Sequence, residues 1–289
     1  MNKKVSVVIA THNRARLLLR TLERLVALPE QPRVIVVDNG SRDDTGRLVK
    51  RAFPSVRVVR LKRNRGAAAR TIGAHVATTP YVAFSDDDCW WEAGALQHAT
   101  RLLDAHADVA VLNARVLVGS SNRLDDACRR MQQSELHKRS ACAGTSIAGF
   151  MAGAVVARRR AFLAAGGYHK RYHIGAEESL LAVDLLDAGW ELIYCDALVL
   201  HHHPAAEERD DRERRRLVFR NRLWTAWLRQ SAWQALKTTA SGALAACGDP
   251  LARAALNDAV RGLPWILRER RPAAFGVQQQ TLRLIDPLA

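Results

Sequence analysis

Residues 81–88 read YVAFSDDD: an apolar run, 81–85, is followed at once by three consecutive carboxylates, Asp86, Asp87 and Asp88. Similar short runs rich in Val and Ile recur through the first half of the chain, and stretches with helical spacing separate them. Strands that alternate with helices are joined by crossovers, so they lie parallel in a sheet that is covered on both faces. The pattern predicts an α/β sandwich.

The expected elements continue this alternation up to about residue 204, where the composition changes. Strands are expected at 5–10, 34–37, 56–61, 81–85 and 109–113, and helices at 15–27, 43–52, 67–77 and 93–105. Further along, we expect helices over 124–139 and 177–188 and strands over 192–195 and 197–200. After Pro204 comes a dense run of mixed charge, 207–216, which marks the start of a C-terminal appendage.

Polar and acidic side chains follow three of the expected strands. Thr11-His12-Asn13-Arg14 comes after the first strand, Asp38-Asn39-Gly40-Ser41 after the second, and the triple Asp after the fourth. Ligands of such sheets bind beyond the carboxyl ends of the strands. One acidic strand end is ordinary helix capping. Three at the same edge are more than capping requires, and they predict a ligand site there.

The triple Asp is a candidate metal site. Mg²⁺ usually takes one or two carboxylates together with substrate phosphates. Adjacent carboxylates repel one another unless a cation relieves the repulsion. A solvated acidic turn is the alternative, but the apolar strand before Asp86 directs these carboxylates to the ligand edge and favours a metal.

Three other segments are chemically suggestive. A helix that begins near Gly66 could offer its N–H groups to phosphate, with charge from Arg65 and Arg70, although basic helix starts are common. Glu177-Glu178 in a first helical turn suits the macrodipole, and one of the two carboxylates could instead be a general base. His201-His202-His203 ends a strand, where imidazole suits Mn²⁺; by alternation the first and third share a face.

The bulk properties set limits on the partners and the compartment. The formal net charge of +15 indicates either a basic soluble surface or an anionic partner, such as nucleic acid, anionic lipid or a phosphorylated substrate. The five cysteines are scattered and are expected to be reduced thiols of a cytoplasmic protein. The longest apolar stretch, 147–157, is far shorter than the roughly 20 residues that span a bilayer. The apolar run near the N-terminus is too short for a signal peptide.

Taken in order, these segments resemble the family 2 glycosyltransferases, which have the GT-A fold. The matching segments are VSVVIATHNR (5–14), VIVVDNGSRDDT (34–45), NRGAAARTIGAHVA (64–77) and FSDDD (84–88), then 153–159, 166–168 and 175–190. The resemblance implies a GT-A-like (Rossmann-like, three-layer) domain over 1–204, divided into a nucleotide-sugar-binding half, 1–115, and an acceptor and catalytic half, 116–204. Residues 205–289 would form a helical C-terminal appendage.

The resemblance also implies residue roles. Asp38 would hold the nucleoside, Asp86 the ribose, and Asp88 the metal ion. Asp86 and His201 would complete the metal site, since His201 stands where many members have a metal-contacting histidine. Glu178 matches the catalytic base, which is more often Asp in the family. The other donor-site residues implied are Thr11, Asn13, Arg14, Arg65, Arg70 and Asp87.

The implied reaction is inverting transfer of a hexose or deoxyhexose from a nucleotide-diphosphate sugar to an acceptor hydroxyl with Mg²⁺ or Mn²⁺. The resemblance implies a UDP- or dTDP-sugar as the donor. The acceptor would belong to cell-surface glycan or glycolipid synthesis, for example a lipid-linked glycan. Two rivals are a non-enzymatic basic protein that binds polyanions or membranes, and a sugar nucleotidyltransferase on a related sheet. A nucleic-acid partner is not expected, because an acidic strand edge would repel its phosphates.

The C-terminal appendage allows two interpretations. Arginines crowd residues 212–222 beside Trp224, Trp227 and Leu228. A helix here could pack its Trp side on the catalytic domain and leave its charges in solvent. Alternatively it could attach the protein to the anionic cytoplasmic face of a membrane, where basic residues and interfacial Trp both contribute to binding.

Overall fold

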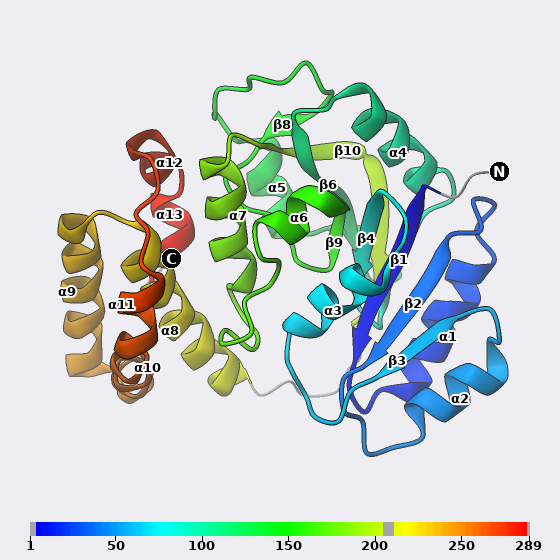
Figure 1. Ribbon diagram of the computed structural model, residues 1–289, viewed down its shortest axis with the longest axis horizontal. Coiled ribbons are helices and arrows are strands. Elements are labelled where there is room, and N and C mark those ends of the chain that lie inside the picture. Colours follow the sequence, from blue (N-terminus) through cyan, green and yellow to red (C-terminus); the bar gives the residue numbers. More distant parts are fainter. Residues whose placement is uncertain (1–3, 205–210, 288–289) are drawn as a thin grey trace.

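The computed structural model describes residues 4–204 and 211–287. Its central feature is a mixed sheet with strand order β3-β2-β1-β4-β9-β6-β10-β5, with β7 paired to β6 and β8 to β10 (Figure 1). The strands are β1 (Val5–Thr11), β2 (Arg33–Asp38), β3 (Arg57–Arg60), β4 (Tyr81–Ser85), β5 (Cys89–Trp91), β6 (Val109–Val118), β7 (Arg123–Leu124), β8 (Thr145–Ser146), β9 (Ala154–Arg158) and β10 (Glu191–His202).

The first half of the sheet is parallel, as the alternation of strands and helices predicts. β1 pairs in parallel with β2 and β4, and β2 with β3. The second half differs: β9 runs antiparallel to its neighbours β4 and β6, and β5 runs antiparallel to β10. The Val- and Ile-rich runs of the central strands are buried, which fits a sheet covered on both faces.

Helices cover both faces of the sheet. The helices of this part are α1 (Ala15–Val26), α2 (Thr45–Ala52), α3 (Ala68–Val76), α4 (Ala95–Ala105), α5 (Asp126–Gln132), α6 (Arg159–Ala164) and α7 (Glu177–Asp187). The chain moves outward from β1 to β3 and then returns to β4, so right-handed crossovers put α3 on the face opposite α1 and α2. Figure 1 shows α6 and α7 on the same face as α3. The architecture confirms the predicted α/β fold with three layers.

Two expected elements differ in detail. The helix expected over 124–139 is confined to α5, which Asp125 caps through its Oδ1, an acceptor for the N–H of Ala127 at 2.8 Å. The two strands expected over 192–200 form one long strand, β10, whose register against β6 shifts between Cys195 and Val199. Asp196 and Ala197 are exposed at that shift, as expected for a bulge.

A glycine sets the distance between α3 and the sheet. A Cβ on Gly73 would lie 2.3 Å from Cγ1 of Val8 and 3.1 Å from Cγ2 of Val37. Any larger residue would therefore push α3 away from β1 and β2. Because Arg70 lies one turn earlier on the same helix, this close approach also fixes the depth at which Arg70 reaches the sheet edge.

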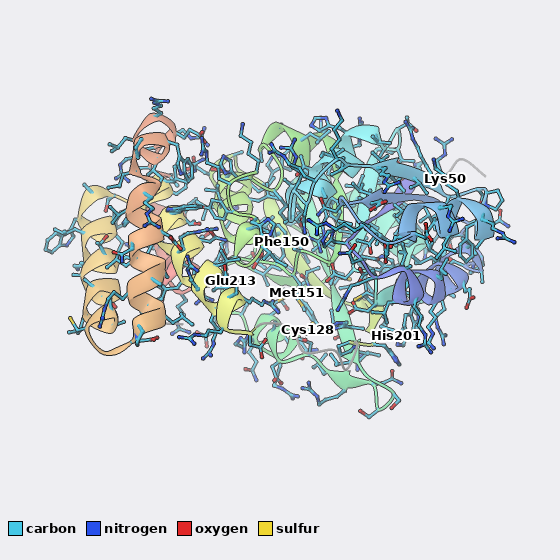
Figure 2. The ribbon with its side chains drawn as sticks, turned by 90° about the horizontal axis from the view of Figure 1, so that it is seen from below. Lys50, Cys128, Phe150, Met151, His201 and Glu213 are labelled. Atoms are coloured by element: carbon cyan, nitrogen blue, oxygen red, sulfur yellow. The ribbon has the colours of Figure 1, made fainter. Side chains whose placement is uncertain are left out.

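The C-terminal region is helical and packs against one end of the sheet domain, as the views in Figures 1 and 2 both show. Its helices are α8 (Asp211–Arg229), α9 (Ala232–Gly248), α10 (Pro250–Arg261), α11 (Leu263–Glu269), α12 (Phe275–Gln280) and α13 (Leu282–Ile285). Glu207, Glu208 and Asp210 of the mixed-charge run lie outside the described residues. Within residues 4–204 and 211–287, no helix is both long and apolar enough to cross a membrane.

The Trp side of α8 is buried. Trp224, Trp227 and Leu228 belong to a second hydrophobic cluster, which also contains Tyr172 and Leu180 of the sheet domain. The structure agrees with the first interpretation of this segment, in which the helix packs its Trp side on the catalytic domain. Trp224 and Trp227 are therefore not available to a membrane, and an attachment site built on them is incorrect.

Candidate functional site

The carboxyl ends of β1, β2 and β4 bring the predicted polar residues to one edge of the sheet. Thr11 and Asp38, the last residues of β1 and β2, are directly paired. Asp38 is 0% exposed, and its Oδ1 accepts the N–H of Ser41 at 2.9 Å. Its Oδ2 lies 3.6 Å from Nε of Arg60 and has no hydrogen bond from the described residues. Asp38 is thus a buried carboxylate at the ligand edge of the sheet, close to Arg60.

Asn13 joins the first two loops of this edge. Its backbone is left-handed, with φ of 55°, which Asn tolerates better than most residues. Its N–H donates to Oγ of Ser41 at 3.0 Å, and its Oδ1 accepts the N–H of Arg42 at 2.8 Å. Asn39, which the sequence did not single out, similarly accepts the N–H of Arg65 at 2.8 Å. These amides hold the loops together as one surface.

The three aspartates have three different environments. Asp87 is buried, and its carboxylate accepts hydrogen bonds from Oγ1 of Thr11 and from the Arg14 guanidinium, both at 2.8 Å. Burial raises the pKa of Asp87, and Arg14 opposes that rise. Thr11, Arg14 and Asp87, three of the predicted donor-site residues, are thus brought together and bonded to one another. Because these three side chains are bonded to one another, they are suited to holding the loops of the site in place.

Asp88 lies in a group of possible metal ligands. Its Oδ1 is 3.4 Å from Sγ of Cys89 and 3.6 Å from Nε2 of His202, and the three side chains form a compact cluster. Asp88 and Cys89 are buried. A carboxylate and an imidazole are ligands that suit Mn²⁺. The donor set therefore fits a divalent cation.

The structure brings His202, and not the predicted His201, to Asp88. In the antiparallel pairing of β10 with β5, His202 lies opposite Cys89 and His201 opposite Trp90. Side chains alternate along a strand, so His201 faces away from the cluster. It stacks on Trp90 with ring centroids 5.7 Å apart, and its Nε2 is 3.2 Å from Glu92 (Figure 2 labels His201). His203 also contacts Trp90, which confirms that His201 and His203 share a face.

Arg70 connects the strand edge to the first turn of α7. Its guanidinium donates to Asp86 and lies 4.0 Å from Oε1 of Glu177. Only 12% of the Arg70 side chain is exposed. The side chain of Arg65, by contrast, is exposed at the surface. Of the two predicted phosphate-binding arginines, only Arg70 is built into the interior of the site.

The two carboxylates at the start of α7 differ as well. Glu177 is buried and faces Arg70. Burial, followed by repulsion from Glu177, raises the pKa of Glu178 to about 8, while Arg214 and Arg222 on α8 oppose the rise. A group with a pKa near neutrality is suited to general base catalysis. The arrangement thus places a carboxyl group with a raised pKa next to Glu177, which Arg70 connects to the acidic strand edge.

A family comparison agrees with this geometry. The model of the family described as Glycosyl transferase family 2 matches residues 6–166. The chain is 36% identical over 140 residues to a validoxylamine A glucosyltransferase of Streptomyces hygroscopicus subsp. limoneus, covering 46% of this chain and 29% of that protein. It is 32% identical over 216 residues to a pre-mycofactocin glycosyltransferase of Mycobacterium tuberculosis, covering 70% and 43%. The chain thus spans less than half the length of these relatives.

A solved structure resembles the whole described fold. A mannosyltransferase from Pyrobaculum calidifontis, in complex with GDP-Man and Mn²⁺, superposes with a TM-score of 0.61 over 100% of this chain and 86% of that chain, at 19% identity. At this identity the similarity concerns the fold, and it confirms the predicted GT-A-like architecture.

The register of β10 predicts which histidine binds metal. We expect His202→Ala to weaken Mn²⁺ binding in the presence of UDP by at least about tenfold, because a ligand of the ion is lost. His201→Ala, the matched control one residue away, should leave the affinity unchanged. Calorimetric titration of Mn²⁺ into each UDP-saturated variant measures both. If only His201→Ala lost affinity for Mn²⁺, His201 would be the metal ligand.

Proposed function

Because the chain belongs to glycosyl transferase family 2, we propose that it transfers one sugar from a nucleotide-diphosphate sugar to an acceptor hydroxyl, with inversion at the sugar and with a divalent metal. The observation that carries the proposal is the buried Arg70 guanidinium between Asp86 and Glu177. It connects an acidic edge suited to a metal-bound diphosphate with the pair of carboxylates that contains the base.

The donor would lie along the strand ends. We assign the nucleoside to Asp38, the carboxylate at the end of β2, and the ribose to Asp86, which is partly exposed. Arg70 and the exposed Arg65 supply positive charge for the diphosphate. Thr11, Arg14 and Asp87, which are bonded to one another, and Asn13, which is bonded to Ser41, would support the donor at this edge.

The metal would be held by Asp88 and His202, with Asp86 toward the diphosphate. When bound, Mn²⁺ or Mg²⁺ supplies positive charge that stabilises the leaving diphosphate. Imidazole in the donor set favours Mn²⁺ over Mg²⁺. His201 is no longer assigned to the metal, because it lies on the other face of β10.

Glu178 is the proposed base. In a single displacement, its carboxylate takes the proton of the acceptor hydroxyl while the hydroxyl oxygen bonds to the anomeric carbon. The bond to the diphosphate breaks, and its electron pair leaves with the diphosphate. Attack from the face opposite the leaving group inverts the anomeric centre. Burial beside Glu177 makes the Glu178 carboxylate a stronger base than an ordinary one, which supports this role.

The substrate classes follow from the resemblance and the surface. We propose a UDP- or dTDP-linked hexose or deoxyhexose as donor and a cell-surface glycan or glycolipid, such as a lipid-linked glycan, as acceptor. Attachment to the cytoplasmic face of an anionic membrane would bring the enzyme to such an acceptor. The basic net charge of +15 supports this attachment.

The outer side of α9 is the surface that supports attachment to a membrane. The Trp side of α8 cannot serve, because it is buried. Trp233 is 64% exposed, Leu236 59% and Leu244 76%, and Lys237 lies over the Trp233 ring at 5.1 Å. An exposed helix face with Trp, Leu and Lys has the composition of an interfacial helix.

The base assignment is testable by mutation. Glu178→Gln keeps the size of the side chain but removes its basicity, so turnover should fall by roughly 10²- to 10⁴-fold with donor affinity nearly intact. In the wild type, kcat/KM should rise with pH and level off above about 8, because only the deprotonated Glu178 accepts a proton. Steady-state release of nucleoside diphosphate measures both. If Glu177→Gln were inactive and Glu178→Gln fully active, the base would be Glu177.

Membrane attachment is tested with vesicles. We expect the protein to co-sediment with anionic liposomes at low salt and less at high salt, because the attraction is screened. Leu236→Gln together with Leu244→Gln should reduce binding, whereas Val26→Gln, on the exposed side of α1 in the sheet domain, should not. The proposed attachment through α9 would be excluded if the protein bound neutral and anionic liposomes equally well. It would also be excluded if the double variant bound as well as the wild type.

A further inference from the structure

A buried amide of α8 is bonded to the loop that precedes the proposed base. Asn221 is 0% exposed. Its Nδ2 donates toward the carbonyl oxygens of Tyr172 at 2.9 Å, Ile174 at 3.2 Å and Gly175 at 2.6 Å. One side chain of the C-terminal helical region therefore shares its two N–H donors among three backbone carbonyls of residues 172–176, which we name the 172–176 loop.

The 172–176 loop has a conformation that needs external support. His173 and Ala176 both have positive φ, 64° and 54°, which residues with a Cβ adopt at a cost. Ala176 is the N-cap residue of α7, so its conformation directs the first turn, which contains Glu177 and Glu178. A change in this loop would therefore reorient both carboxylates.

Other contacts from α8 reach the same loop. The hydroxyl of Tyr172 shares a hydrogen bond of 2.8 Å with Oγ1 of Thr225. Gly175 lies so near Val218 that a Cβ would come within 2.7 Å of its Cγ2. Arg220 donates to the carbonyl oxygen of Tyr172 at 3.0 Å, so α8 holds the loop through several polar contacts, of which those of Asn221 reach three carbonyls.

The opposite side of the loop touches the donor half. The carbonyl oxygen of His173 accepts the N–H of Ala67 at 2.5 Å. A Cβ on Gly66 would lie 2.0 Å from that same oxygen. The start of α3, where a phosphate was expected from the sequence, therefore gives one of its N–H groups to this loop. The loop connects α3, which contains Arg70, with α7, which contains Glu178.

We infer that Asn221 is a positioning residue: it fixes the 172–176 loop so that the Glu178 carboxylate faces the acceptor while α3 holds the donor. The inference rests on the proposed function. It makes the C-terminal helical region a working part of the active site, since α8 supplies the group that sets the geometry of the base.

The decisive variant is Asn221→Ala, which removes the amide and leaves the three carbonyls without it. We expect kcat to fall by roughly 10- to 100-fold, because a small displacement of a catalytic group is costly, while the dissociation constant of the donor stays within about twofold. The matched control is Trp227→Phe, which removes the 2.7 Å hydrogen bond from Trp227 of α8 to Thr239 of α9 and keeps an aromatic ring in place. It should keep kcat near the wild-type value.

A double-mutant cycle separates positioning from general loss of stability. If Asn221 acts through Glu178, then Asn221→Ala should cost less than about threefold in the Glu178→Gln background. An equal loss in both backgrounds would overturn the inference. If Asn221→Ala does not fold, Asn221→Ser, which keeps one hydroxyl donor, enters the same cycle with the same expectations.

A measurement independent of turnover keeps the two proposals apart. Amide hydrogen exchange of residues 173–178 should accelerate in Asn221→Ala and not in Trp227→Phe. Unchanged exchange in Asn221→Ala would refute the role of Asn221 whatever the enzyme does. If the wild type showed no transfer activity while exchange still accelerated in Asn221→Ala, the proposed function would be refuted. That result would nevertheless support the role of Asn221 in holding the 172–176 loop.

Discussion

The site depends on the ion pairs that the buried Arg70 guanidinium makes with two carboxylates. This guanidinium lies between Asp86 at the end of β4 and Glu177 at the start of α7, and little of it is exposed. Removing one partner of a buried ion pair typically costs about 3–5 kcal/mol, because a charge is left uncompensated. The two carboxylates come from parts of the chain that are far apart in sequence. Their common partner therefore fixes the acidic strand edge relative to the proposed base.

The strand ends of this site could be predicted from the sequence for a simple physical reason. Parallel strands joined by crossover helices end at the same edge, so Thr11, Asp38 and Asp86 had to lie close together once the alternation was recognised. Arg70 follows from the same logic, because it lies in the first turn of α3, the helix that leads into β4. The first half of the fold and the composition of its ligand edge thus required only local patterns.

The remaining features depend on pairings between distant segments. Which histidine meets Asp88 is set by the antiparallel register of β10 with β5 and by the register shift between Cys195 and Val199, which makes alternation unreliable across it. The bonding of Asp87 to Thr11 and Arg14 also needs the folded loops. Trp224 and Trp227 had two plausible surroundings, core or membrane, and only tertiary packing distinguishes them. The three carbonyls that meet Asn221 leave no pattern in the sequence.

The central claim is that this edge of the sheet activates a nucleotide-diphosphate sugar. The most direct measurement is release of nucleoside diphosphate from a panel of UDP-, dTDP- and GDP-sugars with Mn²⁺, with and without EDTA. The account predicts that at least one donor is turned over and that EDTA abolishes the reaction. Consumption of a nucleoside triphosphate with a sugar phosphate, and of no nucleotide sugar, would identify a nucleotidyltransferase. Failure to bind any nucleotide, together with salt-sensitive binding to polyanions, would contradict the account altogether.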